Sequence, residues 1–146
     1  MQSSNLNKVN NIFKLFANQH KILKSYLDIN IIKNKASNYT YPMMLVDWTK
    51  NVQLTRGSNE LNCDVYILDK TTRDYLRLTN ILSDNLQTCD DFHTYFIDNL
   101  DKFGFTIDND VTCEPIAFDF EDIICGYKMN IHLTIDDNLM ETEIPI

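Results

Sequence analysis

The side chains best suited to chemistry in this sequence are three histidines, His20, His93 and His132. They are widely separated, and none stands in the H-E-x-x-H, H-x-E or His–Cys spacing by which metal sites are recognised. His20 continues a stripe of apolar residues in the first predicted helix, so we interpret it as a hydrogen-bonded structural histidine. The histidines therefore predict neither a metal site nor a catalytic base.

Acidic residues occur repeatedly as sequence neighbours, as in Asp90-Asp91, Glu121-Asp122 and Asp136-Asp137. General acid–base catalysis needs two carboxylates that face each other across a cleft in different environments, and sequence neighbours do not provide this arrangement. The segment 108–114 begins like a calcium loop, but Cys113 stands where that loop requires glycine. Three glycines in the whole chain leave no Gly-rich phosphate loop. We therefore expect no cofactor and no enzymatic activity.

The charge and the cysteines narrow the classes of function further. A net charge of −8 argues against a surface that binds nucleic acid throughout, because phosphate contacts need clusters of Lys and Arg. The four cysteines form no C-x-x-C pair and match no zinc spacing. The N-terminal segment lacks a signal-peptide pattern, and no apolar run approaches the ~20 residues that cross a bilayer. We expect a reducing compartment, free and mostly buried thiols, and no membrane partner.

Two segments have the periodicity of long helices. Apolar residues recur at steps of three and four from Val9 to Leu27, which predicts a helix from residues 3–5 to about Asp28. A second stripe from Leu78 to Leu100 predicts a helix over residues 74–102. Gly104 would end this helix in the left-handed conformation that glycine adopts easily.

Three segments have the character of strands. Residues 41–48 form a short apolar run, typical of a strand that is covered on both faces. Segments 61–69 and 126–135 alternate between apolar and polar residues, which is typical of strands with one face in the core. Residues 51–59 predict a polar loop or a hairpin arm with Gly57 at its tip.

The remaining strands are shorter and complete the predicted fold. Residues 105–107 and 111–116 predict two strand pieces joined by a turn at 108–110. The order of elements predicts an α+β domain, with a mainly antiparallel β-sheet and two long helices packed on one face. We assign residues 1–135 to this single domain and residues 136–146 to an acidic C-terminal tail.

Several aromatic and apolar residues are candidates for contact with another protein. Trp and Tyr are enriched at the centres of interfaces. The tail spaces apolar residues among acids, which suits a strand added to a neighbour's sheet edge. Partial burial of the aromatic residues and docking of the tail on its own domain are the competing interpretations. The candidate interface residues are Trp48, Arg56, Tyr75, Phe118, Phe120, Leu139 and Ile144.

A series of short motifs follows a fixed order and spacing across residues 9–136. They are Phe16-Ala17-Asn18-Gln19-His20, Tyr41-Pro42-Met43-Met44-Leu45-Val46, Val65-Tyr66-Ile67-Leu68-Asp69, Ser83-Asp84, Glu114-Pro115-Ile116, and residues 119–122 with Gly126-Tyr127. In this order the chain resembles the tail-terminator-like neck proteins of bacteriophages, especially those of crAss-like phages and other phages of Bacteroidetes. Each motif is short, and the resemblance rests on their order and spacing.

The resemblance implies a tail-terminator-like fold and a structural role without catalytic residues. Such proteins form closed rings, six- or twelve-fold, between the portal and the tail, and they contact adjacent portal, neck or tail proteins. The genome passes through the channel without specific binding, and an acidic lumen would suit its passage. The implied location is the virion neck, with assembly in the host cytoplasm. The acidic tail after Asp136 has no counterpart in this resemblance.

A second interpretation, from a different class of function, is a soluble accessory module that binds another protein as a monomer or dimer. It would use the same Trp48 and the same tail. The size of the assembly separates the two interpretations, because a ring must have a cyclic multiple of the 17.1 kDa chain mass.

Overall fold

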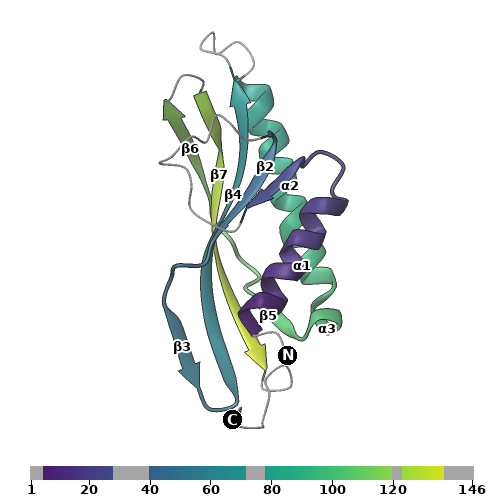
Figure 1. The fold of residues 1–146 in the computed structure, drawn as a ribbon, viewed down its shortest axis with the longest axis vertical. Coiled ribbons are helices and arrows are strands. Elements are labelled where there is room, and N and C mark those ends of the chain that lie inside the picture. Colours follow the sequence, from purple (N-terminus) through teal and green to yellow (C-terminus); the bar gives the residue numbers. More distant parts are fainter. Residues whose placement is uncertain (1–4, 28–39, 72–77, 120–122, 137–146) are drawn as a thin grey trace.

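The structure is a computed structural model that describes residues 5–27, 40–71, 78–119 and 123–136. It has one long, twisted sheet with the helices α1 and α2 on the same side (Figure 1). In chain order the elements are α1 (Asn5–Gln19), β1 (Ser25–Leu27), β2 (Met43–Asp47), β3 (Val52–Thr55), β4 (Ser58–Thr71), α2 (Leu78–Asp98), α3 (Leu100–Phe103), β5 (Phe105–Ile107), β6 (Cys113–Asp119) and β7 (Ile123–Asp136). The predicted α+β class is confirmed.

The two longest strands, β4 and β7, form the centre of the sheet. They pair antiparallel along their whole length, from Ser58 opposite Asp136 to Thr71 opposite Ile123. The outer side of β4 pairs first with β3 and then with β2, and the outer side of β7 pairs with β5 and β6. The short β1 adds to β2 in parallel, so the described seven-stranded sheet is mixed.

Alternation along β4 and β7 separates the main core from the other face, as the sequence predicts. Four residues of β4 and four of β7 point toward the helices and are buried there. The helices contribute a cluster of aromatic rings, with the Phe13 centroid 5.1 Å from those of both Phe92 and Phe96. The strand residues are Leu61, Cys63, Val65, Ile67, Met129, Ile131, Leu133 and Ile135.

A second, smaller buried cluster lies on the opposite face of the sheet. Met43 and Leu45 from β2 meet Tyr66 and Leu68 from β4 and Ile124 from β7. All five residues of β2 are buried. Met43 and Leu45 lie in this smaller cluster, whereas Met44 and Val46 point to the opposite face and lie in the main core. The prediction that this strand is covered on both faces is confirmed.

The first helix ends earlier than predicted, at Gln19 rather than near Asp28. The backbone N–H of Lys24 bonds to the carbonyl of Pro42, 2.8 Å away, so the chain leaves the helix to pair with β2. Leu23 is buried in the core and Leu27 lies in β1. Their spacing fitted a continued helix, but a turn followed by a strand buries both positions as well.

The second long helix agrees with the sequence more closely. α2 spans Leu78–Asp98, and predicted positions 74–77 lie outside the described residues. The side chain of Asn99 donates to the Tyr95 carbonyl at 2.7 Å, and the short α3 follows. Gly104 ends α3 in the left-handed conformation with φ 75°, as predicted.

The two strand pieces predicted near residues 105–116 exist as β5 and β6, but they do not pair with each other. Both β5 and β6 pair with β7, one after the other along the same edge. The segment 108–112 between them lies opposite the shorter segment 130–132 of β7, so it bulges from the edge. The predicted turn at 108–110 is absent: this segment has only a bend at Asn109, and it interrupts one edge of the sheet without reversing the chain.

Gly126 allows β4 and β7 to approach closely. A Cβ at this position would lie 1.9 Å from the carbonyl oxygen of Ile67. We expect Gly126→Ala to lower the free energy of unfolding by about 3 kcal/mol, because backbone would have to move. Urea unfolding followed by circular dichroism measures this loss.

Gly57→Ala is the matched control for this substitution. Gly57 also has a positive φ, 93°, but a Cβ at position 57 would have no other atom within 4 Å. The substitution should cost only about 1 kcal/mol, from the left-handed backbone alone. Equal losses of unfolding free energy in the two variants would show that the close approach of β4 and β7 does not exclude a side chain at position 126.

Candidate interaction surface

The hairpin of β3 and the start of β4, residues 52–61, forms an arm at one end of the sheet (Figure 1). Its turn contains Arg56 and Gly57, and glycine permits the positive φ there. Every residue of β3 is exposed. Of the two predicted alternatives, a loop and a hairpin arm, the structure has the hairpin arm, with Gly57 in its turn.

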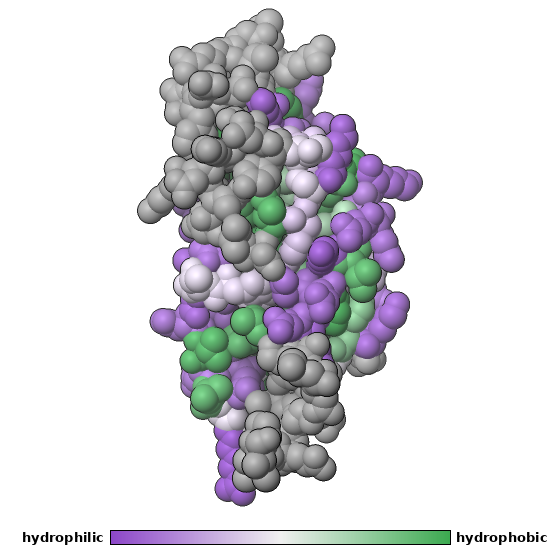
Figure 2. Space-filling model, in the orientation of Figure 1, coloured by the Kyte–Doolittle hydropathy of each residue, from purple (hydrophilic) through white to green (hydrophobic). Residues whose placement is uncertain are grey.

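Two large apolar side chains on this arm are open to solvent. Leu54 is 77% exposed and Val52 is 50% exposed. Figure 2 shows the corresponding hydrophobic colour at the edge of the molecule over β3. Sequence reasoning treated this segment as polar, although the alternation Val52-Gln53-Leu54 was the signal that could have revealed an apolar face.

Strand register shows that these side chains continue the buried face of the sheet. Leu54 lies opposite Asn59, which lies opposite Ile135, which in turn lies opposite Phe105. Side chains in one such row point to the same face. Ile135 and Phe105 are buried in the main core at the other end of this row. The arm therefore carries the helix-side face of the sheet out beyond the part that the helices cover.

The arm begins at a polar cluster on the face away from the helices. Asp47 and Asp64 lie opposite each other on β2 and β4 and are only 5% and 2% exposed. Lys50 Nζ lies 3.0 Å from Asp64 Oδ2, and Asn130 Nδ2 donates to Asp64 Oδ1 at 3.1 Å. The backbone N–H of Thr49 donates to Asp47 Oδ1 at 2.9 Å. The segment 48–51 is thus held to the centre of the sheet.

We call the interactions of Lys50, Thr49 and Asn130 with the carboxylates of Asp47 and Asp64 the clamp, because they hold the base of the arm to the sheet. A hydrogen bond and the charge of Asp64 hold the pKa of Lys50 above its ordinary value. Burial, with added repulsion from Asp64 and Asp47, raises the pKa of the neighbouring Tyr66 hydroxyl. Lys128 lies farther from Asp64, at 3.9 Å. The two carboxylates are engaged by cations and amide donors, so the arrangement fixes the base of the arm.

Trp48 also fixes the base of the arm. Its ring stacks on Phe13, with centroids 5.5 Å apart, and its Nε1 donates to Asn10 Oδ1 at 2.9 Å. It is partly buried against the main core. The sequence singled out Trp48 as a contact residue, and the structure shows that its contacts within the chain join the arm to α1.

The other predicted contact residues are only partly described. Arg56 is exposed at the tip of the arm. Phe118 lies in β6 opposite Ile124, and its side chain lies outside the described part of the chain. Tyr75, Phe120, Leu139 and Ile144 lie in segments outside the described residues, as does the proposed tail beyond residue 136.

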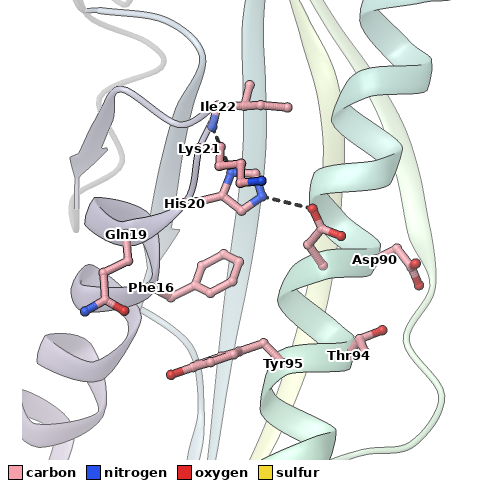
Figure 3. A pocket seen from close by; sticks show the side chains of 9 residues that line it. Phe16, Gln19, His20, Lys21, Ile22, Asp90, Thr94 and Tyr95 are labelled. Atoms are coloured by element: carbon pink, nitrogen blue, oxygen red, sulfur yellow. Dashed lines mark hydrogen bonds and ion pairs between the residues drawn. The ribbon is translucent and has the colours of Figure 1, made fainter.

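A groove of about 640 Å³ lies between the end of α1 and α2 (Figure 3). His20 points across it, and its Nε2 lies 3.0 Å from Asp91 Oδ2. The backbone N–H of Ile22 donates to Nδ1 at 3.2 Å, so the proton shared with Asp91 is on Nε2. Partial burial opposes ionisation of Asp91, but the hydrogen bonds from His20 and Gln87 outweigh it and lower its pKa.

The three histidines do not share one site: His20 pairs with Asp91, whereas His93 and His132 both contact Asp108. Both nitrogens of His20 are satisfied, in agreement with a structural role. His93 contacts the carbonyl of Asp108 at 3.1 Å, and His132 Nδ1 contacts the carboxylate of Asp108 at 3.2 Å. Among the described residues there is no group of three or more His, Cys, Asp or Glu side chains that could hold a metal ion.

Comparisons with known proteins add no assignment: no protein-family model matches the chain, and no curated protein matches its sequence. Within the described part of the chain, none of the helices has the length and apolar character needed to cross a bilayer.

Replacing Lys50 tests the clamp at the base of the arm. Lys50→Met should lower the urea midpoint, because the buried carboxylate of Asp64 loses its nearest cation. Lys14→Met, at an exposed position of α1, removes the same charge away from the cluster and should change the midpoint little. Equal shifts in the two variants would contradict the clamp.

The effect of Lys50 should also depend on pH. Its raised pKa means that it stabilises the folded chain below the unfolded value of 10.5, and that this contribution is lost as the pH rises through the folded value. The difference in midpoint between the wild-type chain and Lys50→Met should stay constant between pH 7 and pH 9 and shrink above pH 10.5. Urea midpoints of both chains at each pH measure it, and a difference that grows with pH would contradict the ion pair.

Proposed function

We propose that this chain is a structural virion subunit that assembles with copies of itself into a closed ring in a phage neck. The ring would sit between portal and tail as a head–tail connector of tail-terminator-like, mainly antiparallel fold. It would contact adjacent portal, neck or tail proteins and shape the channel through which DNA passes. The observation that carries this proposal is the clamped arm with its exposed Leu54 and Val52.

An apolar arm of this kind gains stability when another surface covers it. Complete burial of one Leu or Val side chain contributes about 1.5–3 kcal/mol. The arm is held at its base by the Lys50–Asp64 pair and by Trp48, so little conformational freedom is lost on docking. Covering it with a second copy would therefore be favourable.

A candidate receiving surface for the arm lies on α1 and at its end. Leu15 is 56% exposed and Ile22 is 42% exposed, and Ile22 lines the groove at the end of α1. Figure 1 shows β3 at the lower left end of the sheet and α1 beside the sheet on the right, so the two elements are well separated. Docking of one copy's arm beside the next copy's α1 is a head-to-tail contact, and such contacts make a ring when the rotation closes.

The chain's charge suits a channel for DNA. With a net charge of −8, the surface repels the phosphate backbone on average, so DNA would slide past without specific binding. The alternative function is a protein-binding accessory module that acts as a monomer or dimer. It would use the same exposed arm on a different partner.

The mass of the purified chain in solution tests the ring. Light scattering at low and high salt should give a species at six or twelve times 17.1 kDa. A monomer or dimer at every concentration would favour the accessory module. The proposed virion location is tested separately by mass spectrometry of purified particles, in which a neck subunit must be present.

Leu54→Asp tests whether the arm makes the contact. A buried interface anchor replaced by a charge should weaken assembly by about 30-fold or more. Gln53→Asp adds the same charge to the neighbouring exposed position, on the other face of β3, and should assemble like the wild-type chain. Dilution series followed by light scattering compare the two, and equal weakening would place the contact elsewhere.

The receiving surface has its own pair of variants. Leu15→Asp should weaken assembly as Leu54→Asp does, whereas Asn18→Asp, also exposed on α1, should not. If assembly depends on Leu54 but not on Leu15, the arm still forms one side of the contact, and α1 is excluded as the other side.

A further inference from the structure

A second crevice, of about 400 Å³, lies between α2 and the interrupted edge of the sheet. Two of the four cysteines line it, Cys89 from α2 and Cys113 from the first position of β6. Val111 and Met129 complete the wall on the sheet side, and His93 lies on the helix side. Neither the proposed ring contact nor the polar cluster uses this crevice.

The fold brings the two thiols together from elements that are distant in the sequence. Cys89 belongs to the face of α2 that is buried against the sheet. Cys113 lies opposite Met129, which is buried in the main core, so its side chain points to the helix side as well. Both side chains line the same crevice, and each thiol affects the pKa of the other.

The two thiols differ in access to solvent. Cys89 is 1% exposed, whereas Cys113, which also lines the crevice, is partly exposed. Burial raises the pKa of both thiols, but the neighbouring Cys89 thiol opposes this rise at Cys113. Cys113 is therefore the thiol that an external reagent reaches first and the one whose thiolate the neighbouring thiol favours.

We propose that Cys89 and Cys113 form an oxidisable pair, which a small disulfide such as oxidised glutathione converts into a disulfide between α2 and β6. The Cys113 thiol gives up its proton, and the thiolate attacks one sulfur of the reagent, releasing one molecule of glutathione. The Cys89 thiolate then attacks the Cys113 sulfur of the mixed disulfide and releases the second. Two protein thiols are oxidised while one glutathione disulfide is reduced to two thiols.

The other two cysteines do not compete for this reaction. Cys63 lies fully buried in the main core on β4, and Cys125 is buried on β7. Neither lines the crevice. The bond between Cys89 and Cys113 would close the segment between them into a loop and attach the helix layer to the sheet edge. Such a crosslink restricts the unfolded chain and so raises the melting temperature.

The test uses the full reduced chain, incubated with oxidised glutathione at pH 8.5 and then unfolded and treated with iodoacetamide. We expect two of the four thiols to escape alkylation and a peptide map to join Cys89 to Cys113. The melting temperature should rise by about 5 °C or more and return on reduction with dithiothreitol. This result does not depend on ring assembly.

Two variants distinguish the pair from general thiol oxidation. Cys113→Ser should keep its three thiols alkylatable and gain no thermal stability, whereas Cys125→Ala should form the same crosslink as the wild-type chain. Four alkylatable thiols after oxidation would overturn the proposal. So would a stable glutathione adduct on Cys113 without the internal bond, or a crosslink between other cysteines.

Discussion

The continuous pairing of β4 with β7 is the constraint on which the rest of the structure depends. It joins residues 58–71 to residues 123–136 without interruption. Every other described strand but β1 attaches to one of these two, and β1 attaches through β2. A ribbon of this length requires that the two backbones come together closely, and Gly126 beside the Ile67 carbonyl allows it. Both helices then pack on the face that the ribbon's alternation makes apolar.

The length of this ribbon also explains why an apolar arm is left uncovered. Fourteen strand residues extend about 46 Å at the usual rise, whereas the 15 residues of α1 extend about 22 Å and the 21 residues of α2 about 32 Å. The helices can therefore cover only part of the face, and the row from Phe105 to Leu54 passes from the core into solvent. The exposed end of this buried row is the surface on which the proposed contact depends.

The sequence predicts the parts of this fold that depend on local periodicity. The alternating segments 61–69 and 126–135 are confirmed, since an inward face at every second residue has no good helical counterpart. The predicted end of α1 is wrong because Leu23 and Leu27 fit both a helix and a turn followed by a strand. The pairing partner of β5 and β6 could not be predicted either, because nothing in their own residues indicates that they pair with the distant strand β7. The candidate site was harder to predict because it depends on register. The contact between Lys50 and Asp64 requires β2 and β4 to pair with Asp47 opposite Asp64, and no spacing in the sequence states this.

The buried polar cluster has a physical role in setting that register. Asp64 lies at the middle of β4, opposite Asp47 on one side and Asn130 on the other. A slip of one residue would turn Asp64 into the apolar core, where an unpaired carboxylate is strongly disfavoured. Because β3 is paired with β4, the same slip would turn Leu54 to the opposite face of the sheet. A polar group that stabilises one register therefore also fixes which side of the molecule presents its exposed apolar residues.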